Sequence, residues 1–147
     1  MGHFAKFVSL VAKRNIGVEM VGHTLVVVHG ATHPSDADWA IYLDSLRQNI
    51  DTIHAQLVVT DGGSPNSAQR KASLELAEGR WERTPPTAVV SSSVLARGAV
   101  TALGWFMKDK IRAFSQGEFE EACVFIGARA EQTALHDVVA RLRAALR

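Results

Sequence analysis

Short apolar runs along the chain alternate with longer stretches in which apolar residues recur every three or four positions. Three of the runs are rich in β-branched residues, as in strands buried on both faces: 24–29 (TLVVVH), 56–60 (QLVVT) and 87–91 (TAVVS). Weaker strands are predicted at 15–21 and 110–114, and a turn at Gly22-His23 joins the first of them to 24–29. The stretches between strands predict helices, because their apolar residues share one helical face.

Capping residues mark where these helices begin. Each helix predicted after a strand has a candidate N-cap. These candidates are Ser35, Ser64 before Pro65, Ser92 or Ser93, and Ser115, which forms a capping box with Glu118. Gly79 and Gly127 are placed to end two of the helices. For the helix after residue 93, the expected buried face consists of Val94, Leu95, Ala99, Ala102, Leu103 and Phe106.

The alternation of strand and helix predicts a single α/β domain. Its sheet is expected to be mostly parallel, with four to five strands and helices on both faces, because parallel strands need crossover helices. The domain is predicted to span residues 15–127. Residues 128–147 predict an amphipathic C-terminal helix that packs on the domain, and residues 1–14 form a separate segment. The length of 147 residues suits one domain.

Charge and composition narrow the function classes. Sixteen basic and fifteen acidic residues leave a net charge of +1, which argues against a protein that holds nucleic acid by its phosphates. The apolar runs fall short of the roughly eighteen residues that a transmembrane helix needs, and no cleavable signal is visible, so a cytoplasmic protein is expected. A single cysteine, Cys123, excludes an intramolecular disulfide and a Cys-rich zinc site.

The segment 1–14 is basic and amphipathic. Its apolar residues recur at helical spacing, and its three basic residues have no acidic neighbour: Phe4, Phe7, Val8 and Val11 form the apolar set, and Lys6, Lys13 and Arg14 the basic one. Docking on the domain is favoured over binding to a membrane surface, because most apolar stripes of this size serve packing. The segment and the final helix could dock on one molecule or exchange between two, which leaves a homodimer open.

Candidate chemistry gathers where the strands end, since ligands of such sheets bind beyond the carboxyl ends of the strands. His29, Asp61 and a serine from Ser91–Ser93 could in principle form a hydrolase triad. No G-x-S-x-G elbow surrounds these serines, and helix capping alone explains hydroxyls at such turns, so no enzyme is predicted.

Signals for bound metals and cofactors are weak. His29 and His33 are four residues apart, but in a loop this spacing gives no shared face, so no metal site is predicted. Neither G-x-G-x-x-G nor G-x-x-x-x-G-K-[ST] occurs, so no cofactor is predicted. The turn 62–64 with Arg70 could hold a small anion, but a turn followed by a solvated Arg70-Lys71 pair is the favoured interpretation.

The order of elements resembles the STAS domains, and more closely their SpoIIAA-like (STAS/SEC14-like) branch. The resemblance covers about residues 16–127 and includes a strand with Ala88-Val89-Val90 and the stretch IRAFSQGEFEEACVFIG at 111–127. It implies a non-catalytic regulatory domain, typical of bacteria, that binds a protein partner. Phosphoregulated relatives carry Ser or Thr directly after an Asp at the start of a helix. The matching place here is Asp61-Gly62-Gly63-Ser64, which makes Ser64 the candidate phosphoacceptor.

The partner surface is therefore expected around this turn and the helix that follows it. The predicted contact residues are Asp61, Gly62, Gly63, Ser64, Gln69, Arg70 and Trp81. Trp39 and Trp105 are expected in the core, whereas Trp81 lies in a polar connection and could be an interface anchor or a lid over the sheet edge. The alternative function is a small-molecule or lipid-binding module with a SEC14-like apolar pocket beneath the helices.

Overall fold

The structure is a computed structural model that describes residues 14–80, 84–106 and 110–146, without the side chains of residues 102–106. Its strands are β1 (Ile16–Val21), β2 (Thr24–His29), β3 (Ala55–Thr60), β4 (Thr87–Ser91) and β5 (Ile111–Phe114). Its helices are α2 (Asp36–Asn49), α3 (Ser67–Ala77), α4 (Val94–Phe106), α5 (Phe119–Phe125) and α6 (Gln132–Ala145), with short 3-10 turns η1 (Gln116–Glu118) and η2 (Arg129–Glu131). The predictions for residues 1–13, for Trp81 and for the side chain of Trp105 fall outside the described part.

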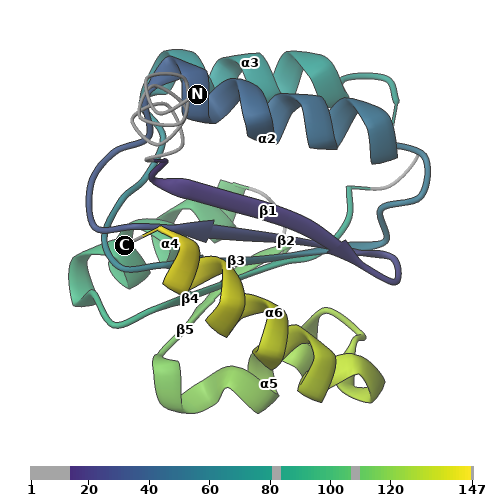
Figure 1. The fold of residues 1–147 in the computed structure, drawn as a ribbon, viewed down its shortest axis with the longest axis vertical. Coiled ribbons are helices and arrows are strands. Elements are labelled where there is room, and N and C mark those ends of the chain that lie inside the picture. Colours follow the sequence, from purple (N-terminus) through teal and green to yellow (C-terminus); the bar gives the residue numbers. More distant parts are fainter. Residues whose placement is uncertain (1–13, 81–83, 107–109, 147) are drawn as a thin grey trace, which may run out of the picture.

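The five strands form one sheet in the order β1-β2-β3-β4-β5 (Figure 1). β1 pairs with β2 antiparallel, and the other neighbours pair in parallel, with His29 beside Thr60 and Thr60 beside Ser91 in register. The predicted α/β fold with a mostly parallel sheet is thus confirmed. In the described part of the chain, no helix is both long and apolar enough to cross a membrane.

Helices cover both faces of the sheet (Figure 1). α2 and α3 lie together on one side, and α5 and α6 lie on the other. Alternate residues of β2 serve the two cores: Leu25 and Val27 pack towards α2, whereas Val26 and Val28 pack towards α5 and α6. The continuous apolar run of this strand is therefore explained by burial on both faces.

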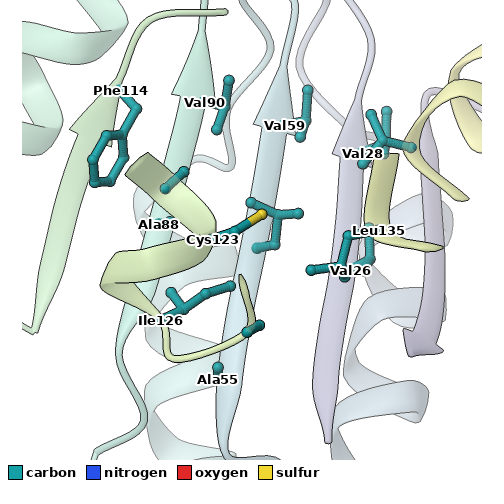
Figure 2. Packing of buried hydrophobic residues seen from close by; sticks show 14 residues of the cluster. Val26, Val28, Ala55, Val59, Ala88, Val90, Phe114, Cys123, Ile126 and Leu135 are labelled. Atoms are coloured by element: carbon teal, nitrogen blue, oxygen red, sulfur yellow. The ribbon is translucent and has the colours of Figure 1, made fainter. Parts of the chain in front are cut away.

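The two faces of the sheet differ in polarity. The face towards α5 and α6 is mostly apolar, with Thr24 as its buried polar residue and with Glu19 and Arg112 nearer its margins, and Figure 2 shows its apolar strand residues against Cys123, Ile126 and Leu135. On the opposite face, four buried polar residues interrupt the apolar surface: His29, Gln56, Thr60 and Ser91. The Tyr42 hydroxyl donates to Gln56 Oε1 at 3.0 Å, and burial raises the pKa of Tyr42 to about 12. Polar side chains are costly to bury, so the face with α2 and α3 is the more informative one for function.

Most of the predicted helix boundaries are confirmed. Ser35 caps α2 in a capping box with Asp38, and Ser115 forms the predicted box with Glu118. Gly79 and Gly127 end α3 and α5 with φ of 71° and 70°, the left-handed conformation that suits glycine.

Two predictions about helix starts were wrong. α3 is capped by Asn66, whose Oδ1 accepts from the Gln69 amide at 2.8 Å, and not by Ser64. In α4 the first two residues were expected in the core, but Val94 is 71% and Leu95 is 88% exposed. α4 packs along β4 and β5, the latter being the edge strand of the sheet, and its first two apolar side chains remain outside this packing.

Candidate functional site at the carboxyl edge of the sheet

The candidate residues gather at one edge of the sheet, where β2, β3 and β4 end in parallel. We call this the carboxyl edge; it consists of residues 14–15, 30–35, 61–66 and 92–95. Residues 14–15 belong to it because β1 runs antiparallel to β2, so that Ile16 lies beside His29. The topology thus brings together three loops and the beginning of the described chain.

The turn after β3 is packed tightly against the loop after β2. The Gly63 amide donates to the Gly30 carbonyl at 2.9 Å, and Gly63 is buried. The Thr60 hydroxyl donates to the Gly63 carbonyl at 2.6 Å and accepts from the Gly62 amide at 3.0 Å. Because both glycine amides are used inside the protein, the turn offers no cradle for an anion, and the anion interpretation is not supported.

Asn15 fixes the start of β1 to the same loop. Its side-chain amide donates to the Thr32 carbonyl and, at 2.6 Å, to the Thr32 hydroxyl. Its carbonyl accepts from the Gly30 amide at 3.1 Å. Sequence reasoning missed this residue, because a contact across seventeen positions leaves no local signal beyond an asparagine before a strand.

His29 is a buried, uncharged group. It is 4% exposed, its ring stacks on Trp39 with centroids 6.1 Å apart, and its Nδ1 has no hydrogen-bond partner among the described residues. Burial lowers the pKa of His29 from 6.5 to about 4, so the imidazole is neutral at pH 7. Trp39, which is 6% exposed, confirms the prediction that this residue belongs to the core.

The acid and the hydroxyls at this edge have other partners. Asp61 Oδ1 pairs with Arg143 Nη2 at 3.2 Å. Ser91 Oγ accepts from the Ser93 amide, and Ser93 Oγ accepts from the Ala96 amide in the first turn of α4. The Asp61 amide donates to the His29 carbonyl at 3.3 Å, but among the described residues no hydrogen bond joins the His29 ring to the Asp61 carboxylate or to these hydroxyls. The serines act here as the capping residues that the strand-to-helix turns require.

Gln69 lies inside the protein rather than on its surface. It is 4% exposed, and its amide nitrogen donates to the Pro34 carbonyl at 3.0 Å and to Asp36 at 3.1 Å. Its Oε1 accepts from the Asn66 amide at 2.9 Å, and its carbonyl accepts from the Trp39 indole at 2.8 Å. The prediction of Gln69 as a direct partner contact is therefore corrected: this residue joins α3 to the beginning of α2.

Asp61, Gly62, Ser64 and Arg70, also predicted as contact residues, are exposed, whereas Gly63 is buried. Ser64 is exposed, and its carbonyl contacts His33 Nδ1 at 2.6 Å. Arg70 is exposed and folds back on the turn, donating to the Pro65 carbonyl at 2.8 Å and to the Ser67 hydroxyl at 3.1 Å. The structure thus places Ser64 and Arg70 at two ends of one short surface segment, with Asp61 beside it.

α3 exposes an apolar side chain among charged ones. Gln69 is its only buried residue, and α3 packs chiefly against α2. Leu74 is 64% exposed; Arg70, Lys71 and Glu75 are also exposed on the same helix, and so is its C-cap residue Glu78. Sequence reasoning did not single out Leu74, although it follows Arg70 by one helical turn.

No metal-binding cluster is present in residues 14–80, 84–106 and 110–146, where no three His, Cys, Asp or Glu residues gather. Cys123 is fully buried, and desolvation raises the pKa of its thiol to about 11, with Glu120 adding to the effect. A thiol with so high a pKa is a poor nucleophile and a poor metal ligand near pH 7.

Comparison with known proteins identifies the fold. The chain is similar to a crystal structure of an uncharacterized protein of the DUF3478 family with a SpoIIAA-like fold, from Shewanella loihica PV-4. The TM-score is 0.50 and the identity 21%, over 76% of this chain and 91% of the other. This chain therefore has a SpoIIAA-like fold, as its sequence predicts. No family model and no curated protein matches it.

Proposed function

We propose that this chain is a non-catalytic regulatory domain that binds a protein partner through the Asp61–Ser64 turn and the exposed side of α3. The observation that carries the proposal is Leu74, a 64% exposed apolar side chain surrounded by charged residues on a helix with one buried residue. An apolar centre with a polar rim is typical of protein interfaces. Arg70 adds a residue type that is enriched at interface anchors.

The carboxyl-edge turn supports this assignment. Its amides and hydroxyls hold the loops in place, so the turn is a rigid platform from which α3 begins. A preorganised surface loses little conformational entropy when a partner binds. The SpoIIAA-like fold is consistent with such a role, and the regulatory function is our proposal for this chain.

The test is affinity capture with quantitative mass spectrometry, using the full chain with Arg70→Glu and Leu74→Asp. We expect the amount of the captured partner to fall at least about tenfold, since anchor residues typically contribute 1–2 kcal/mol or more each. Both side chains are exposed, so the free energy of unfolding is expected to change by no more than about 0.5 kcal/mol.

The matched control carries Arg47→Glu on α2 and Val124→Asp on α5. It makes the same changes of charge at an exposed arginine and at a 53% exposed apolar residue away from α3. The control is expected to keep the partner. Equal capture by both variants, or equal loss from both, would remove α3 as the docking surface.

The small-molecule alternative has one observation in its favour, the polar sheet face with His29, Gln56, Thr60 and Ser91. Such a face suits a polar molecule better than a lipid tail. Under this alternative, native mass spectrometry of protein purified from cells would show a retained small molecule, and His29→Phe would reduce its occupancy. Purified protein with only the mass of the polypeptide would count against this alternative.

A further inference from the structure

The first turn of α4 presents an uncovered apolar pair at the carboxyl edge. Val94 and Leu95 are 71% and 88% exposed, and Leu95 is the most exposed of the large apolar residues in the described part. Their backbone is well fixed, because Ser93 caps the helix and Arg97 Nη1 donates to the Ser91 carbonyl at 3.0 Å. An apolar pair held rigidly in water suits a contact with another apolar surface.

Residues 1–13 are joined to the described chain at this same edge, through Arg14. Asn15 is bonded to Thr32 and Gly30, so this junction lies beside the end of β2. From β1 to β4 the sheet spans three strand spacings, about 14 Å. Thirteen helical residues would measure about 20 Å. The segment is therefore long enough to reach the first turn of α4 by crossing the ends of β2 and β3.

Charge and polarity along this path match the segment. Asp61 lies at the carboxyl edge, where it pairs with Arg143, and Asp36 and Asp38 lie in the first turn of α2, next to residues 30–35; residues 1–13 carry Lys6 and Lys13, and Arg14 follows them, with no acidic residue among these fourteen. Its apolar residues Phe4, Phe7, Val8 and Val11 recur at helical spacing and could pack on Val94 and Leu95. A tethered segment also acts at millimolar effective concentration, which favours it over a separate molecule.

We propose that residues 1–13 dock across the carboxyl edge of their own domain and cover Val94 and Leu95 with their apolar side. On this path the segment passes over the Asp61–Ser64 turn. If the proposed function holds, the segment and the partner compete for this turn, and the segment is autoinhibitory. The docking itself does not depend on the partner, and its test requires none.

The test measures how fast a thiol at position 95 reacts with a soluble disulfide reagent, in the full chain carrying Leu95→Cys. The native Cys123 does not interfere, because it is buried and its thiol stays protonated below a pKa of about 11. Adding Phe7→Asp and Val11→Asp places two charges on the apolar side of the segment. We expect the reaction to become about tenfold faster, as for a contact that is formed nine-tenths of the time.

Two controls make the result specific. Ala5→Asp with Ser9→Asp adds the same charge on the opposite side of the segment and is expected to leave the rate of Leu95→Cys nearly unchanged. Leu74→Cys, on α3, is expected to react equally fast with and without Phe7→Asp and Val11→Asp, which shows that the two charges do not change thiol reactivity in general.

An unchanged rate at position 95 in the Phe7→Asp, Val11→Asp variant would overturn the proposal. So would protection that grows with protein concentration, which would indicate a second copy, or protection that requires phosphatidylserine vesicles, which would indicate a membrane. Loss of partner capture in the α3 variant with an unprotected position 95 would refute the docking and leave the proposed function standing.

Discussion

Replacing Gly63 by alanine is expected to destabilise the protein by about 3 kcal/mol, because the added methyl group has no room. A Cβ at this position would lie 2.1 Å from the Thr32 carbonyl oxygen and 2.8 Å from the Gly30 carbonyl oxygen. Both obstacles are backbone atoms, and the Asn15 side chain holds the loop that carries them. The loop must therefore shift as a whole, and the Gly63 amide loses its bond to Gly30. Urea unfolding of the full chain measures the effect.

Gly98→Ala is the matched control. In the described part of the chain, no atom beyond the adjacent residues and the backbone of α4 itself lies within 4 Å of a Cβ built at Gly98, which is an exposed residue inside α4. Since alanine is the better helix former, this substitution is expected to stabilise the protein by about 0.5–1 kcal/mol. If Gly63→Ala unfolded within about 0.5 kcal/mol of the wild type, the tight packing of the two carboxyl-edge loops would be refuted.

The same packing bears on phosphoregulation. The resemblance places a hydroxyl residue directly after the acid, where this chain has Gly62, followed by Gly63, and a side chain at 63 would meet backbone atoms. Ser64 is exposed and remains the candidate phosphoacceptor, but it precedes the N-cap residue Asn66 by two positions. A phosphate on Ser64 would therefore act on the turn and its contact with His33, rather than as the cap of α3.

The fold followed from the sequence because its determinants are local and repeated. A β-branched run such as 24–29 leaves few alternatives to a buried strand, and Ser35 and Ser115 cap helices through bonds to residues three positions away. The α4 prediction failed at Val94 and Leu95 because α4 is apolar on more than one side. Hydrophobic spacing alone could not select the side that packs on β4 and β5.

The candidate site was predictable in place but not in detail. Parallel topology alone brings Asp61–Ser64 and Ser91–Ser93 to one edge. The burial of Gln69 depends on bonds to Pro34 and Asp36, more than thirty positions away, and the anchoring of Asn15 depends on Thr32. Such pairings become visible only when distant loops are placed side by side.

The free energy of unfolding is expected to fall by about 3 kcal/mol when the pH is lowered from 7 to 4, because His29 is buried in its neutral form. In the unfolded chain the imidazole takes up a proton as the pH falls through 6.5, whereas burial keeps the folded imidazole neutral until about pH 4. Between these values the unfolded state binds more protons, so the free energy of unfolding decreases as the pH falls. The contribution of His29 is fully present above pH 6.5 and is lost by about pH 4.

His29→Phe isolates this contribution from the carboxylates that also titrate in acid. Phenylalanine keeps an aromatic ring beside Trp39, and it replaces an Nδ1 that has no hydrogen-bond partner in the described structure. The variant is expected to show a difference in unfolding free energy between pH 7 and pH 4 that is smaller by about 3 kcal/mol. If wild type and His29→Phe lost the same unfolding free energy between pH 7 and pH 4, the proposed role of His29 would be refuted. That result would mean that His29 titrates as an exposed residue and that the buried polar face is open to water.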